Sequence, residues 1–203
     1  MPLLIATGNA GKLAEFRRLL PDIEIISPSE IGLSSFDVEE SGTTFRENAL
    51  LKARAFADAS GCIAVADDSG LEVDALGGAP GVHSARFGGP DLDDAGRCRL
   101  LLQQLESVSP SRRSARFRCH LMACPPDGDP LVEGQGSCEG LITTAPAGTG
   151  GFGYDPVFWV NELDRTMAQI SSTQKNQISH RGQAIEALRQ PLLATFPELA
   201  KAS

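Results

Sequence analysis

The chain has 203 residues, a net charge of −8 at pH 7, 41% hydrophobic residues and only 5% aromatic residues. This length suits one large domain, spanning residues 1–203, or two tightly joined lobes around a mostly aliphatic core. The acidic balance argues against contact with duplex nucleic acid, which needs a basic face. The sequence has neither a run of about 20 apolar residues nor a basic leader, so we expect no membrane span and no signal peptide.

The chain begins with strand and helix patterns in alternation. Residues 3–6 are an apolar run typical of a buried strand, and apolar side chains then recur at helical spacing over residues 13–20. Thr44 and Glu47 have capping-box spacing, which predicts a helix from about Phe45. This order favours an α/β architecture.

Glycine residues that break elements and alternating apolar and polar side chains predict further elements. Gly61 is expected to end the second helix, and residues 62–66 read as a strand. Residues 115–124 alternate apolar and polar side chains, and residues 131–144 look extended. Asp127-Gly128 between them is a hairpin signal, so antiparallel pairing is expected in the sheet.

The end of the chain adds a strand and a helix. Residues 156–160 are an apolar strand candidate, and Ser179 is expected to cap a helix that Pro191 closes. Residues 77–89 are punctuated by glycine and read as a loop rather than a domain boundary.

The five cysteines form no Cys-x-x-Cys pair, so neither a zinc ribbon nor a thioredoxin-like motif is indicated. Cys119 falls on the apolar side of the alternating strand, which predicts a core position rather than a metal ligand. Reduced core thiols are typical of the cytosol, so a cytoplasmic location is expected.

Two adjacent carboxylates, Asp67 and Asp68, stand between the apolar run 62–66 and Gly70. We expect the strand to end at these acids and Gly70 to turn the chain at the edge of the sheet. Carboxylates in that position can hold a hard divalent metal or take a proton from water.

The junction between the first strand and the first helix is a candidate phosphate site. A helix start exposes unpaired N–H groups and the positive end of its dipole. Lys12 adds a positive charge, and Thr7 and Asn9 add hydrogen-bond donors. The spacing is not that of a Walker A loop. An ordinary strand–helix turn with a surface lysine is the equal alternative.

Residues 148–153 match Gly-x-Gly-x-x-Gly, but Pro146 precedes them and a strand is expected next, so a dinucleotide fingerprint is rejected. We interpret them as a flexible loop that presents Phe152, Tyr154 and Asp155. An aromatic ring beside a carboxylate can stack on a base and hydrogen-bond to it. A core position for Phe152 is the alternative.

Two further groups of polar residues could belong to the same site. Arg181 follows Ser179 and His180 at a helix start, and its donors could read a keto oxygen. A solvated helix start is the alternative reading. Glu39 and Glu40 could complete a metal shell with Asp68, or they could be a solvated acidic loop.

Six motifs stand in one order along the chain. They are Thr-Gly-Asn-x-x-Lys from Thr7, Glu-Glu-x-Gly-x-Thr-Phe-x-Glu-Asn-Ala-x-x-Lys-Ala from Glu39, Asp-Asp-Ser-Gly-Leu from Asp67, Gly-x-Pro-Gly-x-x-Ser-Ala-Arg-Phe from Gly78, Gly-Phe-Gly-Tyr-Asp-Pro from Gly151 and Ser-His-Arg-Gly from Ser179. In these motifs the chain resembles the inosine/xanthosine triphosphate pyrophosphatases of the Ham1-like group. The resemblance covers nearly the whole chain.

The resemblance implies a mixed twisted sheet flanked by helices, with two lobes and an active-site cleft between them. It implies a homodimer that uses Mg²⁺ to hydrolyse ITP, dITP and XTP to the monophosphate and pyrophosphate, removing deaminated purines from the nucleotide pool. The chain departs from the family pattern at Ala168-Gln169-Ile170 and Ser172-Thr173-Gln174, which bears on the local geometry of Lys175.

The resemblance also implies residue roles. Asp68 is the proton acceptor and a metal ligand, assisted by Glu39 or Glu40. The triphosphate is held by Thr7, Gly8, Asn9, Ala10, Gly11, Lys12, Lys52 and Ser69. The base is held by Phe152, Gly153, Tyr154, Asp155, Lys175, His180 and Arg181.

Two other classes of function stay open from the sequence. A nucleotide-binding module would need the lysines and the loop but not Asp68. A metal-dependent phosphatase would cut at the γ-phosphorus and release orthophosphate instead of pyrophosphate.

Overall fold

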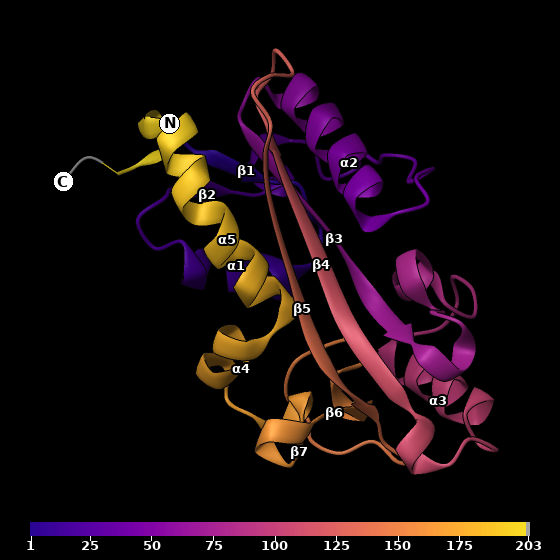
Figure 1. Cartoon of the computed structure of the whole chain (residues 1–203). Helices are drawn as coiled ribbons and strands as arrows, with labels where there is room; N and C mark the ends of the chain where they lie inside the picture. The colour runs from indigo at the N-terminus through magenta and orange to yellow at the C-terminus, as the bar shows by residue number, and fades with distance from the viewer. Residues whose placement is uncertain (202–203) are drawn as a thin grey trace. The chain divides into compact units, whose positions relative to one another are not determined.

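The structure is a computed structural model that describes residues 1–201. The described residues form a seven-stranded sheet with the strand order β2-β1-β3-β4-β5-β6-β7 (Figure 1). The strands are β1 (Leu3–Ile5), β2 (Ile25–Ile26), β3 (Ala64–Val73), β4 (Ser114–Cys124), β5 (Val132–Ile142), β6 (Phe158–Val160) and β7 (Arg165–Thr166). Strand β1 pairs in parallel with β2 and β3, whereas β6 pairs antiparallel with β5 and β7. The predicted mixed sheet is confirmed.

Helices flank this sheet. They are α1 (Ala10–Leu19), α2 (Phe45–Ser60), α3 (Asp94–Gln104), α4 (Ser172–Ile178) and α5 (His180–Thr195). The start of α2 is the predicted one: the Thr44 side chain accepts from the N–H of Glu47, and the Glu47 side chain completes the capping box. Gly61 ends it in the left-handed conformation, with φ of 67°, which glycine adopts without steric penalty.

The chain divides into two compact units. The first consists of Met1–Asp68, Cys119–Gly136 and the described residues from Arg181 onward, and the second of Ser69–Arg118 and Ser137–His180. Three strands, β3, β4 and β5, contribute residues to both units. The boundaries at 68/69 and 180/181 fall inside two of the predicted motifs.

In the first unit, both faces of β1 are buried. Ile5 belongs to a core cluster with Phe16 of α1 and Leu188 of α5, while Leu4 belongs to another with Ala53 of α2. Successive side chains of a strand point to opposite faces, so a strand covered on both sides is apolar throughout. This is why residues 3–6 read as an unbroken apolar run. The burial of β1 also determines where the chain leaves the strand for the candidate phosphate site, residues 7–12.

In the second unit, one core cluster holds Leu71 of β3, Leu101 of α3, Phe117 of β4 and Phe158 of β6. The rings of Phe117 and Phe158 lie 4.5 Å apart between centroids. Helix α3, which the sequence patterns did not reveal, packs here through Cys98 and Leu101.

Three predicted elements are corrected. Strand β3 begins at Ala64 and continues to Val73, so the two acids and Gly70 lie within the strand and Gly70 makes no turn. The apolar residues Leu71 and Val73 are buried and extend the strand into the second core. Residues 155–157 form a 3₁₀ turn, so the strand expected from 156 begins at Phe158.

The third correction concerns the last helix. Pro191 lies inside α5, which continues to Thr195. A proline removes one backbone donor from a helix and normally kinks or ends it. Here Leu192 and Phe196 beyond the proline are buried in the core of the first unit, and this packing offsets the lost hydrogen bond.

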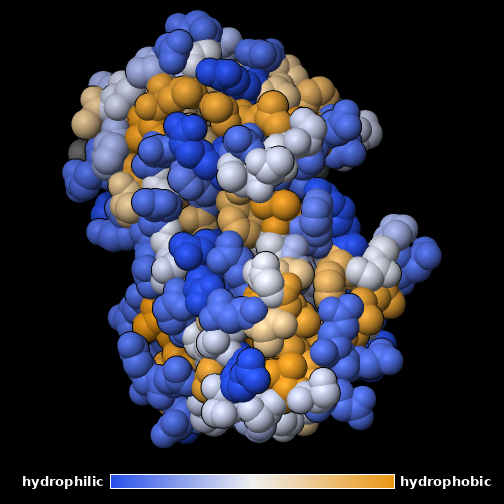
Figure 2. Space-filling model, turned by 45° about the vertical axis from the view of Figure 1, so that its right-hand side comes forward, coloured by the Kyte–Doolittle hydropathy of each residue, from blue (hydrophilic) through white to orange (hydrophobic). Residues whose placement is uncertain are grey.

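The surface carries both hydrophilic and hydrophobic residues. The face in Figure 2 shows hydrophilic residues interspersed with smaller hydrophobic areas, as expected of a protein in which charged residues make up 22% of the chain. Within residues 1–201, the structure contains no helix with the length and apolar character needed to cross a membrane.

Candidate functional site

The candidate phosphate site, residues 7–12, comprises the turn between β1 and α1 and the start of α1. Asn9 is the N-cap of α1, and its Oδ1 accepts from the N–H of Lys12 at 3.0 Å. The hydroxyl of Thr7 accepts from the N–H of Asn9 at 3.1 Å. Gly8, Asn9 and Ala10 are exposed. The turn therefore presents the positive end of α1 to solvent, as an anion site requires.

Asp67 ties this turn to the end of the chain. The ammonium of Lys12 donates to Oδ1 of Asp67 at 2.5 Å, and Nε of Arg181 donates to Oδ2 at 2.6 Å. Burial alone would raise the pKa of Asp67, but Arg181 and Lys12 outweigh it and hold that pKa well below its usual range. Asp67 is therefore a charged anchor in the core.

Arg181 is one of the largest fully buried side chains, with 2% of the residue exposed. Besides Asp67, it bonds through Nη1 to Oε2 of Glu15 at 2.7 Å. Sequence reasoning missed Glu15, although an acid beside Phe16, on the helix face that must be buried, was a usable signal. Arg181 was also read as a helix-start residue open to a base, and the structure shows its guanidinium anchored between two acids.

Lys52 of α2 gathers the second set of charges. Its ammonium donates to Oε1 of Glu40 at 2.6 Å and to Oδ1 of Asp68 at 3.1 Å. Burial alone lowers the pKa of Lys52, but Asp68 and Glu40 outweigh burial, and the net pKa lies above its usual value. Burial of the Asp68 carboxyl raises its pKa, and the nearby charge of Lys52 offsets only part of that rise.

The carboxylates around Lys52 fit a hard divalent cation. Oδ2 of Asp68 is buried and has no hydrogen-bond partner among the residues that the structure describes. Glu40 shares Lys52 with Asp68, whereas Glu39 is exposed. No group of three or more His, Cys, Asp or Glu suited to a metal occurs within residues 1–201. Mg²⁺ is commonly held by one or two carboxylates together with substrate phosphates, and Glu40 and Asp68 are two such carboxylates beside each other on Lys52.

In the second unit, Lys175 and Asp155 form the centre of the predicted base site. The ammonium of Lys175 donates to Oδ2 of Asp155 at 2.6 Å and lies 4.4 Å from the ring centroid of Phe152. The same Oδ2 accepts from the N–H of Phe152 at 2.9 Å. A cation over an aromatic face is attracted to it, so Asp155 and Lys175 together fix where the ring lies.

Tyr154 and Asp155 are not presented outward by the loop, contrary to the sequence interpretation. Both are buried, and the hydroxyl of Tyr154 donates to the carbonyl oxygen of Ser84 at 2.9 Å. The Tyr154 ring belongs to the core cluster of its unit, and burial raises the pKa of its phenol. Phe152 itself is half-buried, so neither full exposure nor a core position describes it.

Ser172-Thr173-Gln174, where the chain departs from the family pattern, forms a regular helix start. Ser171 caps α4 and Gln174 completes the capping box, and Lys175 lies in the last turn of this short helix with its side chain buried. His180, the last residue of this unit, stacks on Phe117 with the ring centroids 4.7 Å apart.

The structure thus brings the predicted residues together as two sets. Within the first unit these are the turn from Thr7 to Lys12, and Glu40, Lys52, Asp67, Asp68 and Arg181. Within the second unit these are Phe152, Asp155 and Lys175, supported by Tyr154, with His180 on Phe117. Ser69 lies in β3 and is half-buried. The cleft implied by the resemblance stays a prediction.

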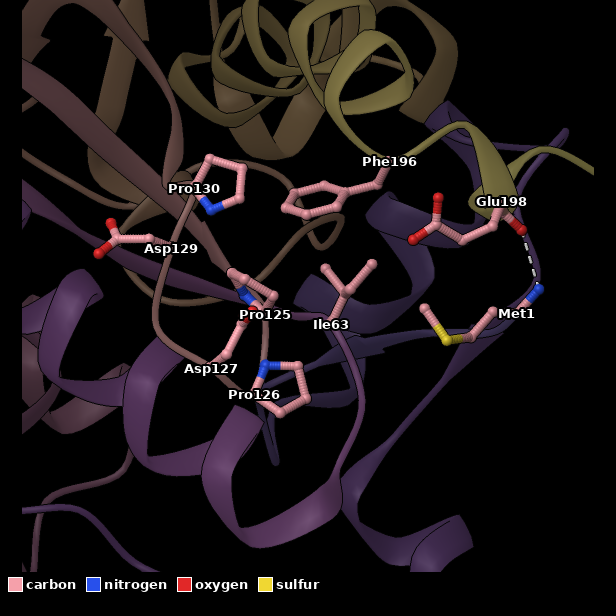
Figure 3. A pocket seen from close by; sticks show the side chains of 9 residues that line it. All are labelled: Met1, Ile63, Pro125, Pro126, Asp127, Asp129, Pro130, Phe196 and Glu198. Atoms are coloured by element: carbon pink, nitrogen blue, oxygen red, sulfur yellow. Dashed lines mark hydrogen bonds between the residues drawn. The ribbon is translucent and has the colours of Figure 1, made fainter.

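A pocket of about 430 Å³ in the first unit contains none of these residues (Figure 3). It is lined by Met1, Ile63, Pro125, Pro126, Asp127, Asp129, Pro130, Phe196 and Glu198. The ammonium of Met1 donates to the carbonyl oxygen of Glu198 at 2.9 Å, and the charged side chains of the lining are all acidic. Such a lining repels a polyphosphate, so this pocket is not the substrate site.

Comparisons with known proteins identify the family of this chain. The model of the Ham1 family matches residues 3–191. A dITP/XTP pyrophosphatase from Bacillus licheniformis is 48% identical over 188 residues, covering 92% of this chain and 95% of that protein. One from Shigella flexneri is 49% identical over 190 residues, covering the same shares. The solved structure of a HAM1 protein from Coxiella burnetii has a TM-score of 0.84 and 42% identity, covering 98% of this chain and 99% of its own. The chain belongs to the Ham1 family.

Proposed function

We propose that this chain hydrolyses deaminated purine nucleoside triphosphates, namely ITP, dITP and XTP, to the monophosphate and pyrophosphate, with Mg²⁺ as cofactor. The observation that carries the proposal is the group formed by Lys52, Glu40 and Asp68 in the unit that also holds the helix-start turn and Lys12. The relatives' names, dITP/XTP pyrophosphatase, support the substrate class.

The first unit supplies the phosphate chemistry. The backbone N–H groups at the start of α1 and the ammonium groups of Lys12 and Lys52 offset phosphate charge. Lys12 is tethered by Asp67 and Lys52 by Glu40 and Asp68, so both cations are held in place before the substrate arrives. Such preorganised charges stabilise a transition state more than mobile ones do.

Asp68 is the proposed general base. Lys52 holds its Oδ1, while Oδ2 is the oxygen with no partner in the described structure. That oxygen takes the proton of the attacking water. Burial raises the pKa of Asp68, so burial increases the affinity of this carboxylate for a proton.

Glu40 and Asp68 would hold Mg²⁺ together with the substrate phosphates, with Glu40 preferred over Glu39 because Glu40 already shares a cation with Asp68. When bound, the metal supplies charge stabilisation at the phosphoryl oxygens. The positive charge of Lys52 partly offsets the rise in the pKa of Asp68 that burial causes.

The second unit supplies the base contacts. The ammonium of Lys175 lies over one face of Phe152, so the base stacks on the opposite face. Asp155 acts mainly through Lys175 and the backbone of Phe152, and Tyr154 contributes support from the core. His180 and Arg181 stay the proposed readers of the purine edge, with Arg181 anchored by Asp67 and Glu15.

We also expect a homodimer in the cytoplasm. Ile31, Phe36 and Leu51 of the first unit are large apolar side chains that are more than a third exposed, and the five cysteines are free thiols, as in a reducing compartment. Sedimentation analysis at micromolar concentration measures the mass, and a monomer there contradicts the dimer.

The test is a panel of nucleoside triphosphates with Mg²⁺ and identified products. Release of pyrophosphate from ITP, dITP and XTP, with ATP and CTP poor substrates, is the expected result. Orthophosphate as the product would indicate a phosphatase, and binding without turnover would indicate a binding module. Removal of Mg²⁺ by EDTA should abolish turnover and its return should restore it.

A further inference from the structure

The loop that carries Phe152 is hydrogen-bonded to α3, a helix that has no role in the function proposed so far. The N–H of Gly153 donates to Oδ2 of Asp94 at 2.8 Å, and the carbonyl oxygen of Gly153 accepts from the thiol of Cys98 at 3.4 Å. Asp94 and Cys98 are four positions apart in α3, so they lie one above the other on the same face. All three residues belong to the second unit.

Gly153 is a residue of this loop whose backbone needs a restraint. Its φ is +61°, a left-handed conformation that glycine enters readily and also leaves readily, because it lacks a Cβ. Its neighbours are held by other bonds: the N–H of Phe152 by Asp155, and the hydroxyl of Tyr154 by Ser84. The two bonds to α3 therefore close the one flexible link between two fixed residues.

The two hydrogen bonds from α3 to Gly153 affect the position of the Phe152 ring through the backbone. Rotation about Gly153 would move the peptide that joins it to Phe152, and the ring would move away from the Lys175 ammonium, which now lies 4.4 Å from its centroid. A stacking contact with a base depends on the position and tilt of the ring. Free rotation of this link would have to be lost on binding, at a cost in affinity.

We propose that Asp94 and Cys98 are positioning residues for the nucleotide base, holding Gly153 so that Phe152 is ready to stack. Neither residue touches the substrate. This inference rests on the proposed function, because it takes residues 152–155 to be the base-binding loop.

The experiment compares matched variants in steady-state kinetics with ITP. Asp94→Ala removes the acceptor, whereas Asp94→Asn keeps an amide oxygen that can accept from Gly153. Cys98→Val removes the donor at similar volume, whereas Cys98→Ser keeps one. Asp91→Ala, at an exposed acid close by in the chain, removes the same charge without touching Gly153.

The Asp94→Ala variant should raise KM for ITP by about 2- to 12-fold, the range for one lost hydrogen bond. Its kcat should stay within about twofold, because a positioning bond acts on binding rather than on the chemical step. Asp94→Asn and Asp91→Ala should keep KM near that of the unmodified protein. Cys98→Val should raise KM less than Asp94→Ala, because a thiol is a weak donor, and Cys98→Ser should restore it.

Amide hydrogen exchange over residues 151–155 gives a readout that needs no turnover. Exchange should be faster in Asp94→Ala and unchanged in Asp94→Asn. Unchanged exchange and unchanged KM in Asp94→Ala overturn the inference, and so does an Asp94→Asn variant that behaves like Asp94→Ala. If the unmodified protein releases no pyrophosphate from ITP, the proposed function fails, and the exchange data still show whether Asp94 holds Gly153.

Discussion

Nε of Arg181 donates to Oδ2 of Asp67 at 2.6 Å, although 114 positions separate the two residues in the chain. Asp67 also accepts from Lys12, and Arg181 also donates to Glu15. One buried network therefore joins the turn after β1, the middle of β3 and the start of α5. Disturbing any member should affect both stability and the proposed site.

Arg181→Ala should reduce the free energy of unfolding by about 3–5 kcal/mol, because it leaves Asp67 and Glu15 without their shared cation in a buried setting. Urea unfolding followed by circular dichroism measures the change. Arg189→Ala is the control: Arg189 pairs with Asp22 at the surface, and exposed pairs contribute about 0–1 kcal/mol. Equal losses in the two variants would contradict the anchoring role of Arg181.

Arg181→Lys tests base reading separately from anchoring. Lysine keeps a positive charge near Asp67 but lacks the planar fork of donors. If Arg181 also reads the 6-keto oxygen, the ratio of kcat/KM for ITP over ATP should fall. The upper range for loss of one charged hydrogen bond is about 10- to 150-fold. A variant that keeps the ratio while losing stability would assign Arg181 to anchoring alone.

Asp68→Asn should lower kcat by about 100-fold or more, because the proposed base and a metal-binding oxygen are lost together. Substrate binding should fall less, since Lys12 and Lys52 remain. Stopped-time assays at saturating ITP and Mg²⁺ give kcat. Asp58→Asn, at an exposed acid of α2, should leave kcat unchanged. A near-normal rate for Asp68→Asn at saturating Mg²⁺ would show that the assignment of the base is wrong.

Glu40→Gln should raise the Mg²⁺ concentration needed for half-maximal activity, whereas Glu39→Gln should not. Glu40 shares the Lys52 ammonium with Asp68, and Glu39 is exposed. Loss of one of two carboxylate ligands weakens binding of a hard cation. Titration of activity with Mg²⁺ at fixed ITP separates the variants, and a larger shift for Glu39→Gln would reverse the assignment.

Thiol modification should distinguish Cys62 from the other cysteines. Cys62 is half-buried and the other four are buried. Burial raises the pKa of Cys98 and of Cys138 to about 11, so only about one in a thousand of either thiol is ionised at pH 8. Iodoacetamide at pH 8, followed by peptide mass spectrometry, should label Cys62 first.

The sign of the pH effect follows from the raised thiol pKa. The folded state favours the neutral thiol, so its contribution to stability is complete below the unfolded pKa near 9 and is lost as pH rises towards 11. Labelling of Cys98 and Cys138 should therefore accelerate above pH 9. Rapid labelling of Cys98 at pH 8 would contradict its burial against Gly153.

The sequence by itself determined the features that depend on neighbours a few positions away. The capping box of Thr44 and Glu47, the left-handed stop at Gly61 and the alternation that buries Cys119 are set by local backbone preference and by which face meets the core. The ordered motifs likewise predicted the family without any knowledge of contacts. These features needed no information about distant parts of the chain.

Tertiary structure decided the rest, because burial and charge pairing depend on residues far away in sequence. Whether β3 stops at Asp68 or continues is settled by the second core, which buries Leu71 and Val73. A local pattern shows Arg181 as a polar helix-start residue, and only packing brings it to Asp67 and Glu15. Removing a charge from water is unfavourable unless a partner is present, so the partners decide which polar residues of the motifs lie inside.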